Sequence, residues 1–404
     1  MAKTNGKGKS ELVQDILTDD PDFLRVMVEN MIQDLLKLEM NQYIGAEWYQ
    51  RSGKRKGHRN GYKPRTLRTR VGTLNLLVPQ DREGNFSTNL FGRYQRSEKA
   101  LVLSIMEMYV HGVSTRKVAS ITEALCGTNF SKSQVSALSG RLDVDLKAWR
   151  HRPFTGSYPY LTVDARYEDV REDGRVVSQG VLIVTGVRAD DKREILAVTV
   201  ADTESEAAYN ELFRDLKARG LKGVMLVTSD NHSGIKAAIK RNFQGASWQR
   251  CQFHFTKNAT GLVSRKKRGE IAAGIREVFV APDLESARRL YEQAADRWAG
   301  SHPRVAGLIE NGIEDCLAVL AFPLKHRPRI RTTNGLERLN QEIKRRTRVV
   351  RIFPDREACL RLVTALCAEQ SDEWVTGISY LNMEELEEKK ETKNQKAREL
   401  QVIG

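Results

Sequence analysis

Three runs rich in β-branched and aromatic residues decide the fold: YPYLTVDARY (158–167), VVSQGVLIVTGV (176–187) and REILAVTVA (193–201). Turn-forming or charged residues separate the runs, EDVREDGR between the first two and RADDK before the third. Short β-rich runs that are divided in this way are typical of neighbouring antiparallel strands. The sequence therefore predicts a three-stranded antiparallel meander.

The segments after the meander extend it into a larger core. ESEAAYNELFRDLKARG (204–220) predicts a helix that Gly220 closes. KGVMLVTSD (222–230) predicts a fourth strand, GIKAAIKRNF a short helix, and ASWQRC (246–251) a possible fifth strand. The chain order β-β-β-α-β-α-β predicts a mixed α/β fold, a ribonuclease H-like core with a mixed sheet between helices.

Two acids lie where this core would carry chemistry. Asp164 interrupts the apolar first strand, and Asp230 stands at the end of the fourth. If these strands pair in parallel, the two side chains come side by side. A third acid, Glu337, falls in the first turn of a helix that is predicted to open near Asn334. Carboxylates that converge from separate elements can hold two hard divalent ions, which stabilise the attacking and leaving oxygens of a phosphoryl transfer.

Each acid also has a structural interpretation. Asp164 could end a strand or pair with Arg166. Asp230 could make an Asx turn in SDNHSG. Glu337 could close a capping box with Asn334 as the N-cap, since the spacing N-x-x-E fits.

The segment between the second and third acids is mainly helical, which predicts an all-helical insertion over 256–328. Trp298 in this segment could stack on a distorted base or lie in the core. Cys251 and His254 form half of a zinc site, but no second pair completes it, so Cys251 is interpreted as a buried thiol. His232 could touch the carboxylate site or face solvent.

The chain is basic, with 66 Lys and Arg against 52 Asp and Glu in 404 residues and a net charge of +14. Arg51–Arg70 holds nine cations and no acid, and shorter basic blocks lie at 265–268 and 344–351. A solvated surface explains one such block alone, but three of them favour contacts to nucleic-acid phosphates. The candidate DNA-binding residues are Arg55, Lys56, Arg59, Lys63, Arg65, Lys132, Gln134, Lys344, Arg345 and Arg348.

Residues 98–149 predict three helices, the second capped by Ser114 and the third, 132–149, by Ser131. This pattern suits a helix-turn-helix whose third helix presents Lys132 and Gln134 to base edges. Earlier in the chain, residues 22–46 predict a helix with apolar residues at 23, 27, 31, 35 and 38, for core packing or a dimer contact. LRTRVGTLNLLVP (67–79) predicts a short hairpin after the first basic block.

Composition excludes several other classes of protein. No apolar run approaches the roughly 18 residues that span a bilayer. The stretch MAKTNGKGKS lacks the apolar region of a signal peptide, and five scattered cysteines do not suggest a disulfide framework. A cytoplasmic, DNA-binding protein is expected, and no GxxxxGK[ST] motif points to nucleotide-driven chemistry.

Several motifs together resemble the Mutator-type transposases of bacterial insertion sequences. They are WQRCQFHFTKN (248–258), RTTNGLERLNQEIKRRTRVVRIFP (331–354), LRLVTALCAEQSDEW (360–374), HGVSTRKVASI and SDNHSGI. The resemblance implies an Asp-Asp-Glu transposase with Asp164, Asp230 and Glu337 as catalytic residues and with two Mg²⁺ ions, or Mn²⁺ as a substitute. The family's Cys-x-x-His pair falls on Cys251 and His254.

The resemblance further implies cleavage and joining of double-stranded DNA at terminal inverted repeats, at least a homodimer, and a location at the bacterial nucleoid. A nuclease or resolvase that does not join DNA, and a non-catalytic DNA-binding regulator, remain alternatives. The expected regions are an N-terminal helical and basic region (1–95), a helix-turn-helix module (96–150), the first part of the core (151–255), the helical insertion (256–328), the last core helices (329–380) and a charged tail (381–404).

Overall fold

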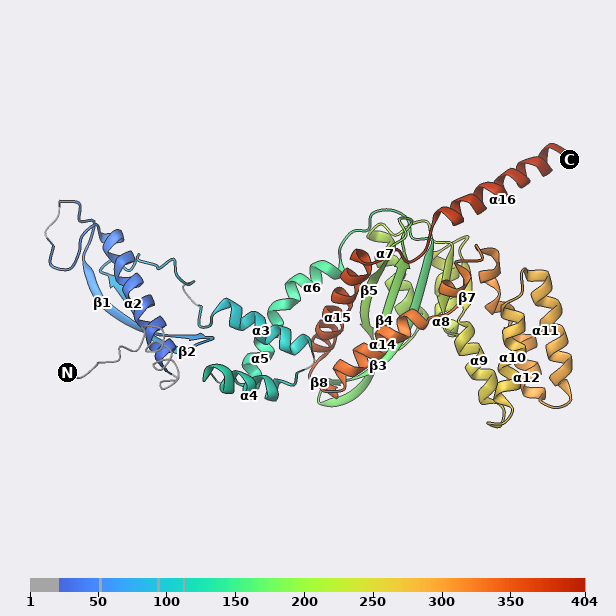
Figure 1. Cartoon of the computed structure of the whole chain (residues 1–404), viewed down its shortest axis with the longest axis horizontal. Helices are drawn as coiled ribbons and strands as arrows, with labels where there is room; N and C mark the ends of the chain where they lie inside the picture. The colour runs from blue at the N-terminus through green and yellow to red at the C-terminus, as the bar shows by residue number, and fades with distance from the viewer. Residues whose placement is uncertain (1–21, 51–52, 93–94, 112, 129, 404) are drawn as a thin grey trace, which may run out of the picture. The chain divides into compact units, whose positions relative to one another are not determined.

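The computed structural model describes residues 22–50, 53–92, 95–111, 113–128 and 130–403, without the side chains of Lys132 and of several residues after 392. By its internal contacts the chain divides into two compact units, residues 1–141 and 142–404 (Figure 1). The boundary places the last helix of the expected 96–150 module in the second unit.

The first unit begins with a helix packed on a two-stranded hairpin. Helix α2 spans Phe23–Ile44, and the antiparallel strands are β1 (Arg59–Thr69) and β2 (Gly72–Asp81). A small apolar core joins α2 to the hairpin, with Leu36, Leu67, Leu74, Leu76 and Phe91 buried. The hairpin is longer than predicted because much of the basic block forms β1 instead of preceding the hairpin.

Helix α2 packs on the hairpin through residues that widen its predicted apolar face, Val28, Ile32 and Leu36, and not through the stripe at 23, 27, 31, 35 and 38. Its buried residues are Leu36, Met40 and Ile44. On the predicted face, Met27, Met31, Leu35 and Leu38 are exposed, Met31 to 58%. The spacing identified the helix, but the residues beside the stripe, and not the stripe itself, pack on the hairpin.

Three short helices follow in the first unit: α3 (Lys99–Val110), α4 (Thr115–Cys126) and α5 (Lys132–Ser139). The expected stop of the first helix at Gly112 lies outside the described residues. Ser114 and Ser131 cap α4 and α5 as predicted. The third predicted helix is broken, since a 3₁₀ turn (Gly140–Leu142) separates α5 from α6 (Asp143–Arg150).

The second unit is built on a six-stranded sheet in the order β5-β4-β3-β6-β7, with β8 also paired to β3. The predicted meander is confirmed, because β3–β4 and β4–β5 are antiparallel. The pairs β3–β6, β6–β7 and β3–β8 are parallel. The strands are β3 (Tyr160–Glu172), β4 (Arg175–Val187), β5 (Arg193–Ala201), β6 (Leu226–Ser229), β7 (Ser247–Arg250) and β8 (Ile352–Phe353).

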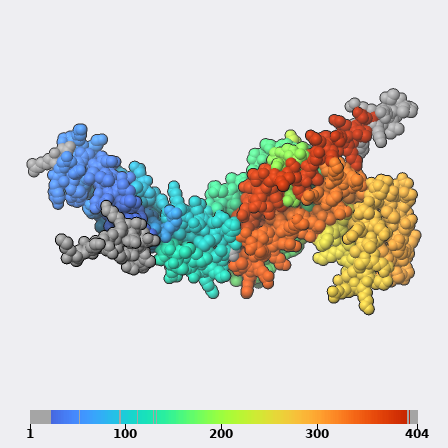
Figure 2. All heavy atoms as spheres, viewed as in Figure 1, coloured from blue at the N-terminus to red at the C-terminus, as the bar shows by residue number. Residues whose placement is uncertain are grey.

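Helices cover this sheet, so the predicted mixed α/β class is confirmed. Phe213 of α7 and Ile239 of α8 are buried in one apolar cluster with residues of β3, β4, β5 and β6. Helix α15 contacts β3 and β5, and α14 contacts β3. Residues of α14 and α15, orange to red, form part of the surface seen in Figure 2. The helices are α7 (Glu206–Ala218), α8 (Ser233–Asn242), α14 (Asn334–Thr347) and α15 (Arg356–Thr376).

A helical segment separates β7 from α14, and its apolar core also includes Tyr160, Val187 and Leu226 of the sheet. Trp298 is central to that core, 1% exposed, and its ring leaves no room for a side chain at Gly274. The idea that Trp298 stacks on a base is therefore wrong, and the core interpretation holds. The helices here are α9 (Gln252–Gly261), α10 (Arg268–Phe279), α11 (Leu284–Ala299), α12 (Pro303–Gly312) and α13 (Arg327–Ile330), with 3₁₀ turns at Glu314–Cys316 and Ala318–Ala321.

The charged tail forms helix α16 (Glu384–Ile403). Leu386 near its start is buried with Leu381 and Met383 in the core of the helical segment. All five cysteines are buried and free. Within the described residues, no helix has the length and apolar character needed to cross a membrane.

Candidate active site

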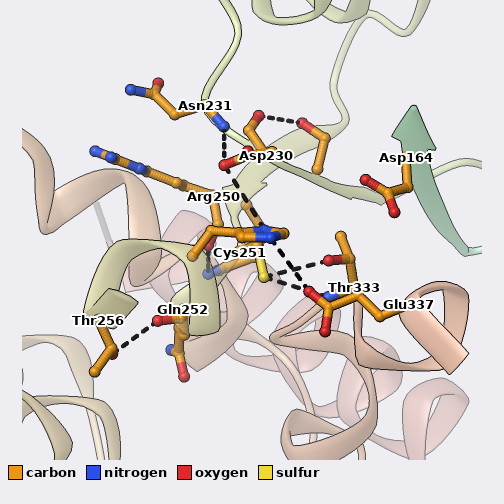
Figure 3. Close-up of polar contacts among 12 residues, drawn as sticks. Asp164, Asp230, Asn231, Arg250, Cys251, Gln252, Thr256, Thr333 and Glu337 are labelled. Atoms are coloured by element: carbon orange, nitrogen blue, oxygen red, sulfur yellow. Dashed lines mark hydrogen bonds and ion pairs between the residues drawn. The ribbon is translucent and has the colours of Figure 1, made fainter. Parts of the chain in front are cut away.

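The register of the central strands brings Asp164 and Asp230 together. Strands β3 and β6 run parallel with Thr162 opposite Thr228, so each aspartate stands two residues beyond a paired position. Asp164 is within β3, whereas Asp230 follows the last residue of β6. The side-by-side placement predicted from the chain order follows from this register. In Figure 3, Asp164, Asp230 and Glu337 lie around one region and come from three separate elements.

Asp164 lies in a largely buried setting that disfavours its charge. Burial raises the pKa of its carboxyl group to about 6, and nearby Glu337 adds to the rise. A hydrogen bond from Asn340 Nδ2 to Asp164 Oδ2, 2.7 Å long, acts in the opposite direction and orients the carboxyl group. Asp164 thus has the electrostatic character of a group that gains by binding a cation.

The possible pairing of Asp164 with Arg166 does not occur. Arg166 forms a buried ion pair with Glu168 and donates to the backbone oxygen of Asn340 at 2.7 Å. Thr347 at the end of α14 also donates to Glu168, at 3.0 Å. Arg166 and Glu168 therefore attach α14 to β3 and leave Asp164 available.

Asp230 stands at the open end of β6. Its side chain is 54% exposed, and its Oδ1 accepts the backbone N–H of Asn231 at 2.7 Å. The backbone oxygen of Asp230 accepts the N–H of His232 at 3.1 Å, which forms the tight turn into α8. Asp230 thus takes part in a turn, as the structural interpretation expected, and its carboxylate is still accessible to solvent.

Glu337 occupies the first turn of α14, as predicted, but not as part of a capping box. The N-cap is Thr333, whose side chain makes no capping hydrogen bond, and Asn334 is already the first helical residue. The Glu337 side chain contacts His254, with Oε1 at 3.2 Å from Nε2. The capping interpretation of Glu337 is therefore wrong.

His254 bridges two of the three acids. Its Nδ1 is 3.8 Å from Asp230 Oδ1, and its Nε2 is 3.2 Å from Glu337 Oε1. The adjacent Cys251 thiol, with Asp230 and Glu337, raises the pKa of His254 to about 9 against the opposing effect of burial. The imidazolium form is thus favoured at neutral pH and holds Asp230 and Glu337 at a fixed separation.

Cys251 connects the end of the sheet to the start of α14. Its backbone N–H donates to Ser229 at 2.8 Å, and its sulfur accepts the backbone N–H of Thr333 at 3.4 Å and the Thr333 hydroxyl at 3.5 Å. Burial acts to raise the pKa of this thiol, but the interactions with His254 and Thr333 outweigh it and lower the pKa overall. The predicted buried thiol is confirmed, and it also has a defined partner.

Two more hydrogen bonds fix the same junction. Thr228 in β6 donates its hydroxyl to the backbone oxygen of Ile330 at 2.6 Å. The N–H of Gln252 donates to the backbone oxygen of Arg331 at 3.1 Å. The segment just before α14 is thereby tied to the strands that end at Asp230, which places Glu337 next to that acid.

The chemistry of these side chains suits a hard divalent cation, since carboxylate oxygens are the ligands that Mg²⁺ prefers. The Oδ1 atom of Asn340 is also buried and without a hydrogen-bond partner beside Asp164. Within the described residues, however, no three His, Cys, Asp or Glu side chains are close enough to hold an ion as they stand. The carboxylate oxygens are thus of the right chemical type to bind Mg²⁺. In the structure, His254 lies between Asp230 and Glu337.

His232 does not join the carboxylates among the contacts that the structure describes. Its ring nitrogen Nδ1 accepts the N–H of Gly234 at 3.3 Å and so caps α8. The ring also lies 6.3 Å from that of Tyr209. His232 therefore has a local structural role.

The basic residues of the hairpin fall into two groups. Arg59 donates to Asn41 Oδ1 and to the backbone oxygen of Ala46, both at 2.6 Å. Arg65 donates to the backbone oxygens of Gly92 and Gln95. Both arginines therefore have a role in the fold, and their expected role in DNA binding stays a prediction. The candidates Arg55, Lys56 and Lys63 are exposed.

The two candidates in α5 differ in what the structure describes. Gln134 accepts the backbone N–H of Ser131 at 3.0 Å and completes a capping box with it. Gln134 thus has a capping role, and its expected contact with base edges stays a prediction. The side chain of Lys132 lies outside the described part of the chain.

The basic residues at the end of α14 are divided in a similar way. Arg345 and Arg346 both pair with Glu342, at 2.7 and 2.8 Å, and these pairs lower the pKa of Glu342 to about 2. Lys344, on the same helix, and Arg348, at its C-cap, are exposed. Arg345 is thus partly neutralised, whereas Lys344 and Arg348 remain candidate phosphate contacts.

Sequence reasoning missed Asn340 and Thr333, which position Asp164 and the start of α14. Asn340 is three residues after Glu337, so the helical period offered a signal for it. No comparable signal existed for Thr333, because its contact with Cys251 joins segments far apart in the chain.

The chain is similar to a known family and to several of its members. The sequence profile of the family described as "Transposase, Mutator family" matches residues 1–377. The transposase for insertion sequence element ISRM5 of Rhizobium meliloti is 47% identical over 96% of this chain and 98% of its own length. The IS406 transposase of Burkholderia multivorans is 45% identical over 87% of this chain and 91% of its own.

A more distant relative agrees with this pattern. The IS256 transposase of Staphylococcus aureus is 38% identical over 93% of this chain and 98% of its own length. Among solved structures, the Drosophila P element transposase strand transfer complex has a low similarity, with a TM-score of 0.30 and 10% identity over 76% of this chain and 85% of that chain. On the family match and the close relatives, this chain belongs to the Mutator family of transposases.

Proposed function

We propose that this chain is the DNA transposase of a bacterial insertion sequence, acting at the nucleoid, and that Asp164, Asp230 and Glu337 are its catalytic residues. The observation that carries the proposal is the parallel register of β3 and β6, which puts Asp164 and Asp230 at matching positions. The contact of His254 with both Asp230 and Glu337 joins the third acid to this pair. The family and the names of its close relatives support the reaction class.

The sheet supports a ribonuclease H-like assignment for the core. An antiparallel meander forms one edge, and β6 and β7 continue the sheet in parallel on the other side of β3. The all-helical segment enters between β7 and α14, between the second and third acids. We assign it as the insertion that separates these acids.

In this proposal the three carboxylates hold two Mg²⁺ ions, which supply Lewis-acid activation and neutralise charge on the phosphate. The chain's own residues prepare that state. Burial makes ionised Asp164 costly until a cation is present, and Asn340 keeps its carboxyl group oriented. His254 contacts both Asp230 and Glu337, the two other carboxylates that would hold the ions.

The reaction sequence is cleavage followed by joining. Water attacks a phosphodiester at a transposon end, which breaks one strand and leaves a 3′-hydroxyl. That hydroxyl then attacks a second phosphodiester, so a new bond forms as an old one breaks and no covalent link to the protein is made. We place these steps at terminal inverted repeats.

Positioning of the DNA falls to exposed cations. Lys344 lies on α14, the helix that carries Glu337, and Arg348 caps its end, so both would contact the DNA backbone on the same side of the site as Glu337. Arg55, Lys56 and Lys63 on the first unit add phosphate contacts away from the chemistry.

A homodimer is part of the proposal because two ends must be held together. The exposed apolar side chains Met27, Met31 and Leu38 of α2 are the candidate contact, since an amphipathic helix with an open apolar face needs a partner. Replacing Met31 and Leu38 by Gln is expected to shift the oligomer to a smaller species in light scattering. An unchanged mass would remove α2 from the interface.

The test of the function uses labelled duplex that carries the ends of the chain's own element, with and without Mg²⁺. The wild-type chain is expected to nick and join the ends only with the metal, and Asp164→Asn to bind DNA without reacting. Asp169→Asn, an exposed acid on the same strand, is the matched control and should react normally. Cleavage without joining would indicate a nuclease, and binding without reaction in all three would indicate a regulator.

A second measurement does not depend on activity. Mg²⁺ is expected to raise the Tm of the wild-type chain and of Asp169→Asn but not that of Asp164→Asn. Equal shifts in all three proteins would place the ion elsewhere.

A further inference from the structure

A turn of the first unit presents aromatic rings to solvent. Trp48 is 48% exposed, Tyr49 is 93% exposed, and Tyr62 on the neighbouring strand β1 is 38% exposed. The Trp48 and Tyr62 rings are nearly parallel, at 13° with 6.4 Å between centroids, and Tyr49 lies 5.9 Å from Trp48. Rings of this size are normally buried, so a cluster of three at one exposed turn needs a function.

The surrounding structure holds the Trp48 ring in place. The guanidinium of Arg59 is 5.4 Å from the ring centroid, and it is itself fixed by hydrogen bonds to Asn41, Ala46 and Glu47. Arg59 is part-buried, so this contact is held by the fold and not by chance on a mobile surface. The ring is therefore preorganised, which lowers the entropic cost of binding a flat partner.

Tyr49 has an unfavourable backbone conformation. The N–H of Gln50 bonds to the oxygen of Glu47 at 3.3 Å, which makes a four-residue turn with Tyr49 at its third position. The φ of Tyr49 is +59°, in the region that favours Gly or Asn. A bulky ring kept at such a position, with almost no burial in return, is the pattern of strain retained at a functional site.

The charge around the cluster indicates the partner. The sequence from Arg51 to Arg70 contains nine Lys or Arg and no acid. Lys54, Arg55, Lys56 and Lys63 are exposed. Cations that bind phosphates, combined with exposed rings, are the features of surfaces that stack on unpaired nucleic-acid bases.

We propose that Trp48 and Tyr49 stack on a base that is unpaired or displaced from the helix in the bound DNA, while the neighbouring cations hold its backbone. This inference rests on the proposed function only in taking DNA as the substrate. It adds recognition of a distorted base, which the paired duplex does not offer.

The experiment uses the full chain in EDTA, so that no reaction occurs. The probes are a paired duplex with the end sequence of the element and the same duplex with one unpaired 2-aminopurine. The wild-type chain is expected to bind the unpaired probe more tightly and to quench its fluorescence. Trp48→Leu and Tyr49→Leu are expected to bind that probe roughly 5- to 100-fold more weakly and the paired duplex almost unchanged.

Conservative variants test the role of the rings. Trp48→Phe and Tyr49→Phe keep a stacking face and should retain most of the affinity. Tyr49→Asn suits the positive φ, so it should keep or raise the Tm while it loses the preference for the unpaired probe. A well-folded Tyr49→Asn protein that still prefers the unpaired probe would overturn the proposal.

Two failures can be told apart. If the wild-type chain binds neither probe, the proposed function fails along with this inference. If it binds both probes equally, or if the Leu variants lose affinity for both equally, DNA binding stands and only the stacking role is wrong.

Discussion

The carboxylate site and the basic hairpin are both charged, but they are assembled differently. Asp164, Asp230 and Glu337 come from three distant segments, and each is set by contacts across the fold. The hairpin surface comes from one continuous stretch, and two of its arginines donate to backbone oxygens outside the hairpin, Arg59 to Ala46 and Arg65 to Gly92. The sheet site thus depends on long-range geometry, whereas the hairpin depends on which cations are left exposed.

The arginines of the hairpin and those of α14 also differ in the groups to which they donate hydrogen bonds. Arg59 and Arg65 donate to neutral carbonyl and amide oxygens, so the hairpin keeps their positive charge. In α14, Arg345 and Arg346 share the carboxylate of Glu342, so their charge is partly cancelled. A count of Lys and Arg in the sequence does not distinguish the basic block of the hairpin from that of α14. The structure shows that the hairpin keeps more of its positive potential.

The largest effect is expected from Glu337→Gln, set against Glu342→Gln on the same helix. Loss of a proposed metal ligand should lower strand cleavage by at least about 10³-fold, which corresponds to roughly 4 kcal/mol. Glu342→Gln should keep cleavage and tighten DNA binding, since it removes the carboxylate that pairs with the exposed Arg345. Gel assays of cleavage and binding measure both. Equal losses of cleavage would mean that α14 acts only through its fold.

Asp164→Asn is expected to stabilise the metal-free chain. The pKa of Asp164 is raised to about 6 in the folded state, above its ordinary value of 3.8, so the ionised group destabilises the fold above pH 6. The penalty is at most about 3 kcal/mol at pH 8 and falls as the pH approaches 4. Thermal unfolding in EDTA should show a Tm gain for the variant at pH 8 that is about half as large at pH 5.

A gain that does not change with pH would contradict this origin. Asp169→Asn, which alters an exposed acid of the same strand, should change the Tm little at either pH.

Arg59→Gln and Lys63→Gln separate fold from binding within the hairpin. Removing Arg59 leaves the Asn41 and Ala46 oxygens without their donor, which should cost the first unit roughly 1–2 kcal/mol. Lys63→Gln should leave stability unchanged and reduce the salt dependence of DNA binding by about one phosphate contact. Calorimetry and a salt titration measure the two effects. A stable Arg59→Gln protein with weakened binding would reverse the assignment.

Cys251→Ala should have the smallest effect. Without the sulfur, the start of α14 loses the acceptor of both Thr333 donors, so Glu337 is less well placed. We expect a roughly 10-fold loss of cleavage and faster hydrogen exchange at the first amides of α14. Cys251→Ser should recover part of both. Cys126→Ala, a buried cysteine of the other unit, should leave exchange in α14 unchanged.

Local patterns predicted most elements of the sheet, because hydrophobic period and turn residues act over a few neighbours. They failed where two solutions had the same local pattern, as with the apolar stripe of α2 and the residues that widen it, and with the helix that breaks at Gly140–Leu142. The strand β8 was missed because two residues carry no period. The register between strands that are far apart in the chain cannot be predicted from any single segment.

The three acids were reached from the residues and from the family resemblance, and the structure places them around one region. What holds them there was not predictable. The bridge of His254, the sulfur contact of Cys251 and the diversion of Arg166 to Glu168 each join segments far apart in the chain. Likewise, sequence alone could not separate Arg59 and Arg65 from the exposed cations beside them.

The junction at the end of the sheet bears on how the helical segment can vary. Gln252, the first residue of that segment, bonds to Arg331, which comes just after its last helix. The two ends of the segment are therefore joined at one junction. The length of the segment does not set the distance between Asp230 and Glu337. Changes in the segment that keep this junction and its packing against Tyr160 and Leu226 of the sheet should therefore leave the positions of the acids unchanged.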